Sequence, residues 1–302
     1  MHRIYGWVFE PGFFASQPVH VALVIGGVVA VVSAATGVFT VMRGQSFGGH
    51  ALGDVSAAGG SGALLIGFSP IAGFVGLGIV GAGVMDLIGV QRLRSRDLAT
   101  GIVLGAAIGM SALFLYVNTS SGATQQILFG SIFTASSATI GVVVILGALA
   151  LGTVAAIYRP LLLATVSPDI AAARGIPVRL IGIAYMLTLA VSVGLSSVAT
   201  GAILSTALLI GPAAAALRLT RRVSTAVLAA CLIGVAATWV GILLTYDSYY
   251  WGSARRLPVS FFIVAVVFAA YLLAGLSSRW AVSRAETATV TPAVASPDQI
   301  AA

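Results

Sequence analysis

The sequence predicts an all-α fold, a polytopic bundle of transmembrane helices. Of the 302 residues, 59% are hydrophobic and only 8% are charged, whereas about a quarter of the residues of a soluble domain are charged. Apolar runs of about 20 residues, enough to cross a bilayer as a helix, follow one another along most of the chain. The basic residues are all arginines between these runs, a pattern typical of membrane topology rather than of nucleic-acid binding.

We expect about nine spans, with about eight to ten possible. They are residues 20–42, 47–68, 70–90, 98–117, 138–157, 180–199, 201–217, 223–246 and 258–276. Gly and Ala recur within them at intervals that allow close approach of helix backbones. With the N-terminus outside and the C-terminus inside, every arginine except Arg3, Arg255 and Arg256 lies on the cytoplasmic side. The positive-inside rule favours that orientation.

The chain divides into one large membrane domain and two terminal segments. Residues 1–19 are rich in aromatic residues and contain two prolines, so we expect a short interfacial segment on the outer surface. Residues 20–276 form the transmembrane domain. Residues 277–302 are expected to be a cytoplasmic, largely disordered tail, because residues 285–302 are mostly small and polar.

The second span contains a histidine and a carboxylate, His50 and Asp54. At a spacing of four residues they share one helical face. Polar groups in hydrocarbon cost several kcal/mol unless they have a function or a partner, and a nitrogen with a carboxylate oxygen suits Zn²⁺, Mn²⁺ or Fe²⁺. The alternative is a polar pair that satisfies itself near a helix end.

The first of two informative cytoplasmic segments is residues 167–179, "SPDIAAARGIPVR". Ser167 or Asp169 would cap a short helix at its start, and Gly175 and Pro177 would end it. Such a helix on the membrane surface is suited to contact a partner, although an ordinary connecting loop is the alternative.

The second cytoplasmic segment is residues 208–222, "LLIGPAAAALRLTRR". A proline at the first helical position is favourable, so we expect a second short helix that begins at Pro212. It would end in three basic residues, Arg218, Arg221 and Arg222. This helix is also a candidate contact for a partner protein.

Two further features exclude classes of function. The single cysteine, Cys231, rules out disulfides within the chain and cysteine-based metal clusters. A phosphate-binding P-loop requires a lysine, and the chain contains none. The chain is therefore not itself an ATPase.

Five stretches occur in the order "RGQSFGGHALGDVSAAGGSG", "LATGIVLGAAIGMSALFLY", "QQILFGSIF", "SPDIAAARGIPVRLI" and "VATGAILSTALLIGPAAAALRLTRR". In this order they resemble the permease subunits of the zinc, manganese and iron ABC importers, the ABC-3 type. The resemblance implies a type II importer fold and a homodimer in the bacterial cytoplasmic membrane. It also implies two copies of a separate ATPase and an extracytoplasmic metal-binding lipoprotein or periplasmic protein. The transported ion would be manganese or zinc, then iron, with no permanently bound cofactor.

The resemblance also assigns residues. In these permeases an acidic residue precedes a histidine by four positions on the metal path, the route of the ion through the permease. Here His50 stands at the acidic position and Asp54 at the histidine position, so the order is exchanged. A two-fold dimer would bring together two such pairs as up to four ligands.

The remaining candidate residues belong to contacts with partners. By the same resemblance, ATPase coupling is expected at Pro212, Arg218, Arg221, Arg222, Asp169 and Arg174. Arg255 and Arg256, in the outer loop of residues 246–258, oppose the positive-inside trend. They are therefore candidates for contact with an acidic binding protein, or alternatively with lipid headgroups.

Two other functions compete with the importer permease. An ion-gradient-driven secondary metal transporter or exporter would usually contain inverted repeats and charged coupling residues at the bilayer midplane. A membrane-embedded enzyme would need a nucleophile and a base, or a metal triad, on facing spans. Neither pattern is evident in the sequence, and we expect a transport subunit rather than an enzyme.

Overall fold

The structure, a computed structural model, describes residue 13 and residues 16–88, 96–118, 122–130, 132–133, 136–248 and 257–289. All the regular elements in this part of the chain are helices. The predicted interfacial segment, residues 1–19, falls largely outside the described residues.

Each predicted span corresponds to one long helix. The long helices are α2 (Gln17–Met42), α3 (Ser46–Leu65), α4 (Pro70–Ile88), α5 (Arg96–Val117), α7 (Ser137–Val166), α9 (Val178–Thr200), α10 (Ala202–Leu219), α11 (Val223–Ser248) and α12 (Val259–Thr289). Two short helices, α6 (Ala123–Phe129) and α8 (Pro168–Ala173), lie between them. Within the described ranges, 7 helices are long and apolar enough to cross a membrane, and α3 and α10 fall outside that set. The prediction of an all-α polytopic bundle is confirmed, and the number of spans is about as expected.

Burial separates central helices from peripheral ones. In the most apolar window of α2, 72% of the residues are buried, against 17% for α5 and 22% for α7. The more polar α3 is also central, because most of its residues are buried between α4, α5 and α9. Helices α2, α3, α9 and α10 thus form the interior, and the outer helices carry most of the exposed large apolar side chains.

Glycine allows close packing where α3 crosses α4. A Cβ atom added to Gly59 would lie 2.1 Å from the carbonyl oxygen of Gly73, and one added to Gly73 would lie 2.2 Å from that of Gly59. No side chain fits between the two backbones at this point. Small residues therefore set the separation of these helices, as the recurring Gly and Ala predicted.

Two prolines lie inside helices rather than at their ends. Helix α10 runs without interruption from Ala202 to Leu219 through Pro212, which is buried, so the prediction of a short helix beginning at Pro212 is wrong. Helix α7 likewise continues through Pro160 to Val166, beyond the expected end of its span. Tertiary packing overrides the local helix-breaking preference, because neighbouring helices in a membrane protein can satisfy the freed backbone groups.

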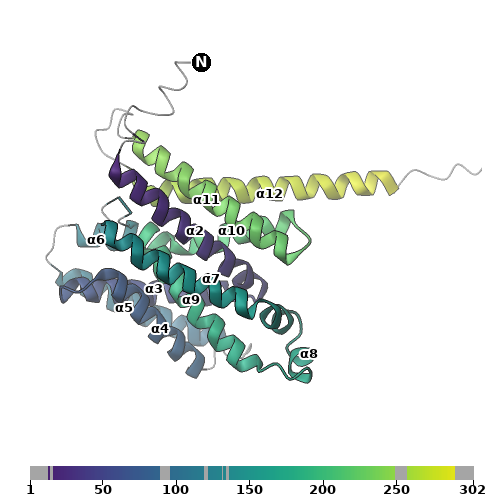
Figure 1. Cartoon of the computed structure of the whole chain (residues 1–302), viewed down its shortest axis with the longest axis horizontal. Helices are drawn as coiled ribbons and strands as arrows, with labels where there is room; N and C mark the ends of the chain where they lie inside the picture. Colours follow the sequence, from purple (N-terminus) through teal and green to yellow (C-terminus); the bar gives the residue numbers. More distant parts are fainter. Residues whose placement is uncertain are drawn as a thin grey trace, which may run out of the picture.

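The two predicted cytoplasmic segments lie at the same end of the bundle. Figure 1 shows α8 and the turn between α10 and α11 at one end of the bundle, with α6 at the other. The short helix α8 is confirmed: the Ser167 side chain accepts a hydrogen bond from the Ile170 N–H, and Gly175 follows with φ of +76°.

Helix α12 projects beyond the rest of the bundle (Figure 1). It reaches Thr289, so the first part of the predicted tail is helical, not disordered, whereas residues 290–302 lie outside the described residues. The extension contains Ala, Arg and Glu, which are good helix formers, and this composition explains why the helix continues beyond the apolar span.

Candidate functional site

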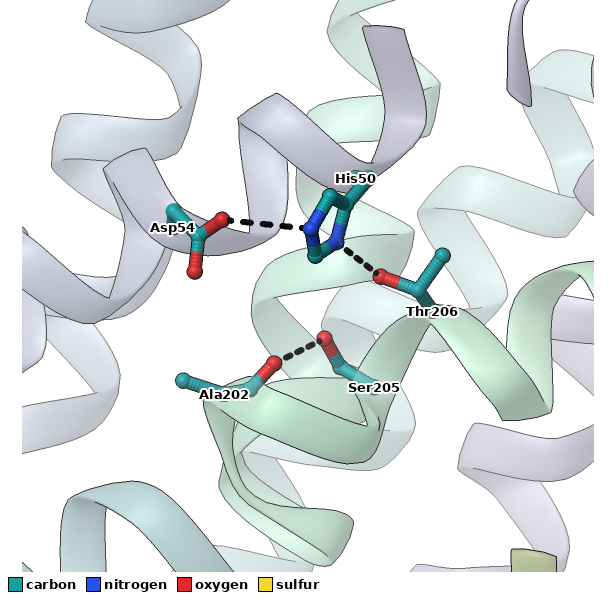
Figure 2. A network of polar contacts seen from close by, with 5 residues as sticks. All are labelled: His50, Asp54, Ala202, Ser205 and Thr206. Atoms are coloured by element: carbon teal, nitrogen blue, oxygen red, sulfur yellow. Dashed lines mark hydrogen bonds and ion pairs between the residues drawn. The ribbon is translucent and has the colours of Figure 1, made fainter. Parts of the chain in front are cut away.

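The candidate site is the polar pair on α3. His50 and Asp54 lie one turn apart on the same face, with 3.7 Å between His50 Nε2 and Asp54 Oδ2. Figure 2 shows the two side chains directed toward each other. The structure therefore confirms the shared face that the spacing predicted.

The separation of these two atoms is longer than a hydrogen bond. Oδ2 of Asp54 is buried and has no hydrogen-bond partner among the described residues. Two ligands about 2.1 Å from one tetrahedral cation lie about 3.4 Å apart. The 3.7 Å between Nε2 and Oδ2 is close to that value, so both atoms could bind one cation after a small adjustment.

A third side chain contacts the pair from another helix. His50 Nδ1 lies 2.9 Å from Thr206 Oγ1 on α10, and Figure 2 shows this contact on the side of the ring away from Asp54. Thr206 is not among the residues that the sequence pattern predicted for this site. A hydroxyl residue in an apolar helix has no local feature that distinguishes it from a packing residue such as its neighbour Ser205.

The pair is accessible but incomplete in a single chain. The His50 side chain is 41% exposed and that of Asp54 17% exposed. In the described part of the chain, no cluster of three or more His, Cys, Asp or Glu side chains is suitable for a metal. Ser56, the oxygen-bearing residue two positions after Asp54, is fully buried and faces Gly78 on α4. One chain therefore supplies two candidate ligands here.

A buried cluster supports the start of α3. The Tyr185 hydroxyl on α9 donates to the Thr36 carbonyl oxygen, 3.1 Å away, and lies 2.7 Å from Thr40 Oγ1. The Arg43 guanidinium lies over the Tyr185 ring, 5.3 Å from its centroid, and Arg43 Nε donates to Gln45 Oε1. Burial lowers the pKa of Arg43, and interaction with Tyr185 partly offsets that effect. These contacts attach the α2–α3 turn to α9.

The proposed coupling residues differ in their surroundings. Asp169 and Arg174 are exposed on and beside α8, and Arg221 and Arg222 are exposed in the turn after α10. Arg218 is also exposed, but it donates a hydrogen bond to the Tyr271 hydroxyl of α12 and lies over that ring. Pro212 is the exception among the six. It lies in the middle of α10 and is buried, so it is not available at the surface for contact with a partner.

Two predicted site residues fall outside the structural description. Arg255 and Arg256, the candidate contacts for a binding protein, belong to residues 249–256, which the structure does not describe. Their assignment stays a prediction from charge and topology.

The chain matches one protein family and is similar in sequence to membrane proteins of metal transport systems. Residues 16–277 match the family model described as the ABC 3 transport family. The manganese transport system membrane protein MntC of Listeria innocua is 28% identical over 253 residues, covering 84% of this chain and 89% of that protein. A protein of Haemophilus influenzae named as a probable iron transport system membrane protein is 25% identical over 274 residues, covering 88% of this chain and 98% of the relative.

A solved structure has a similar fold. The structure of PsaBC from Streptococcus pneumoniae in complex with Fab contains a chain that aligns with a TM-score of 0.78 at 23% identity. The alignment covers 90% of this chain and 95% of the other. The common fold thus extends over nearly the whole membrane domain.

Proposed function

The chain belongs to the ABC 3 transport family, and from that premise we propose that it is the membrane-spanning permease of an importer for a divalent metal ion. The observation that carries the proposal is the 3.7 Å separation of His50 Nε2 and Asp54 Oδ2, with Oδ2 free of hydrogen bonds within the described structure. A nitrogen and an anionic oxygen can replace water ligands of a cation inside a membrane.

Manganese is the first candidate for the transported ion. Relatives that cover most of the chain are named as manganese transport proteins, and another is named as a probable iron transport protein. Mn²⁺ accepts oxygen and imidazole ligands, and Zn²⁺ accepts the same donors in tetrahedral sites. We therefore rank manganese first, with zinc and iron as competitors.

A second copy of the chain would complete the site. The exposed face of His50 leaves room for ligands from outside the chain, and a two-fold axis beside α3 would bring two His50–Asp54 pairs together. Four such ligands without thiolate would bind a metal loosely enough to release it, as transport requires.

The energy would come from two copies of a separate ATPase on the cytoplasmic face. Exposed residues of α8 and of the α10–α11 turn lie at one end of the bundle, where such a partner could contact both. At the outer face, an extracytoplasmic binding protein would deliver the metal. Acidic substitution of both Arg255 and Arg256 should weaken its capture in a salt-dependent manner, and unchanged capture would favour headgroup contacts instead.

Metal uptake by cells tests the proposal. We expect His50→Ala and Asp54→Ala each to reduce Mn²⁺ uptake to the level of cells that lack the chain, with normal amounts of protein in the membrane. Asp97→Asn, on the exposed start of α5, is the matched control and should transport normally. Competition by Zn²⁺ and Fe²⁺ ranks the ions. Near-normal uptake by both alanine variants would place the metal path elsewhere.

A further inference from the structure

The contact between His50 and Thr206 extends the proposed function and rests on it. We propose that Thr206 is a positioning residue that fixes the ring orientation and the tautomer of His50 for metal binding. Figure 2 shows Thr206 on one side of the imidazole and Asp54 on the other. The two ring nitrogens therefore have different neighbours, one a hydroxyl and one a carboxylate.

The proposed tautomer gives each ring nitrogen of His50 a separate role. A neutral imidazole has one N–H donor and one nitrogen with a free lone pair. His50 Nδ1 lies 2.9 Å from Thr206 Oγ1, a normal hydrogen-bond distance. With the proton on Nδ1, it donates to Thr206, and the Nε2 lone pair is directed toward Asp54. That is the nitrogen needed for a cation between the two side chains, and a hydrogen bond from the second nitrogen is usual for metal-binding histidines.

Helix α10 holds Thr206 close to α3. A Cβ atom on Gly53 would lie 3.1 Å from Ser205 Oγ and 3.9 Å from Thr206 Oγ1, so the missing side chain at Gly53 permits this approach. The adjacent turn of α10 is attached to α9 by Ser196 Oγ, which donates to the backbone carbonyl oxygen of Ser205. This bond does not involve the Ser205 side chain, whose own hydroxyl makes only a local bond to the Ala202 carbonyl oxygen. Thr206 is therefore attached to a well-anchored part of the bundle.

The chain offers a conservative variant and a matched control. Thr206→Ser retains the hydroxyl group, whereas Thr206→Val replaces it with a methyl group of similar size. Ser205 is the control, because it is adjacent, buried and hydrogen-bonded to Ala202 rather than to His50. Loss of affinity in Thr206→Val but not in Ser205→Ala would separate positioning of His50 from general packing of α10.

The first measurement is Mn²⁺ binding to the purified full-length permease together with Mn²⁺ uptake by cells. In Thr206→Val we expect the Kd and the KM of uptake to rise about 10- to 100-fold, the usual cost of losing a partner of a ligand. Thr206→Ser should restore both to within about 3-fold of the original protein, and Ser205→Ala should leave both unchanged. Combining Thr206→Val with His50→Ala should give no further loss of Mn²⁺ affinity beyond that of His50→Ala.

The second measurement does not depend on variants of Thr206. Nitrogen NMR of the histidine-labelled protein loaded with Zn²⁺, which is diamagnetic, should place the His50 proton on Nδ1 and the metal on Nε2. A proton on Nε2, an unchanged Kd in Thr206→Val, or failure of Thr206→Ser to restore binding would each overturn the positioning role. Normal Mn²⁺ uptake by His50→Ala would instead contradict the proposed metal path. That outcome is therefore distinct from the outcomes that contradict only the positioning role of Thr206.

Discussion

His50 and Asp54 present the same donors that the family pattern leads one to expect, but in exchanged order. Exchange over one turn moves each donor by about 6 Å along the helix axis. The nitrogen then lies nearer to the Ser46 end of α3 and the carboxylate farther from it. The position of His50 also brings its ring within 2.9 Å of Thr206 Oγ1, so in this chain the histidine of the pair has a hydroxyl partner from α10.

The balance of nitrogen and oxygen donors should influence the choice of metal. His50→Asp replaces the imidazole with a second carboxylate, and oxygen ligands suit Mn²⁺ better than Zn²⁺. We expect this variant to retain part of its Mn²⁺ uptake while Zn²⁺ uptake falls by a larger factor. Parallel uptake assays with the two ions test this expectation.

A second variant separates the set of donors from their order. The double exchange His50→Asp with Asp54→His should be tolerated if only the donor set matters. If His50→Asp lowers Mn²⁺ uptake and Zn²⁺ uptake by the same factor, the imidazole nitrogen has no metal-selective role. Loss of uptake in the double exchange alone would show that the order, and with it the contact to Thr206, is required.

At the scale of the helix, α10 joins the two regions that the proposed function needs. It contains Thr206 near its start and reaches Arg218 about 18 Å farther along without a break. If the Arg218 end of α10 contacts the ATPase as proposed, its displacement would act on the His50 ring through a single helix. A short helix beginning at Pro212 would have separated Thr206 from Arg218. The continuous helix instead connects the two residues directly.

The exposed basic turn after α10 should matter for coupling to the ATPase. Reversal of charge in Arg221→Glu with Arg222→Glu should reduce Mn²⁺ uptake at least about 10-fold while the folded dimer remains, because an acidic groove on the partner would repel it. Uptake and ATP hydrolysis, measured on the assembled transporter, test whether the two become uncoupled. Arg159→Glu, an exposed reversal on α7, is the control, and normal uptake by the double variant would exclude docking at this turn.

The break between α9 and α10 requires glycine. Gly201 has φ of +80°, and a Cβ atom there would lie 2.2 Å from the Leu128 carbonyl oxygen. This combination of positive φ with ψ of 164° is almost restricted to glycine and costs other residues about 1–3 kcal/mol, and the clash with a backbone atom adds to it. Gly201→Ala should lower the melting temperature of the detergent-solubilised protein by several degrees.

Gly141, which has free space where a side chain would be added, provides the comparison for Gly201. A Cβ atom on Gly141 of α7 would have no atom within 4 Å, so Gly141→Ala should leave the melting temperature nearly unchanged. A similar small effect in Gly201→Ala would contradict the close packing of the α9–α10 break against the end of α6.

At the scale of the whole molecule, the expected orientation makes a direct prediction. In a Cys231→Ser background, Thr124→Cys on α6 should react with an impermeant thiol reagent from outside intact cells. Ala172→Cys on α8 should react only after the membrane is opened, because the two exposed positions lie at opposite ends of the bundle. The reverse pattern would overturn the N-outside orientation and the cytoplasmic location of α8.

The amino-acid sequence by itself determined the membrane class, the positions of the long helices and the shared face of His50 and Asp54. Hydropathy and the helical repeat are local properties, and a spacing of four residues fixes a face wherever a helix forms. The short helix α8 was also predictable, because its cap at Ser167 and its end at Gly175 depend on neighbouring residues alone.

Only the tertiary structure decided the features that depend on packing between distant segments. Pro212 lies inside a continuous helix and is buried in the bundle, although proline locally favours a helix start. Thr206 meets His50 although 156 residues separate them, and no local pattern encodes that contact. Arg218 is bound to Tyr271 for the same reason. Long-range packing selects which polar side chains meet, whereas local hydropathy and helical periodicity select only which segments become helices.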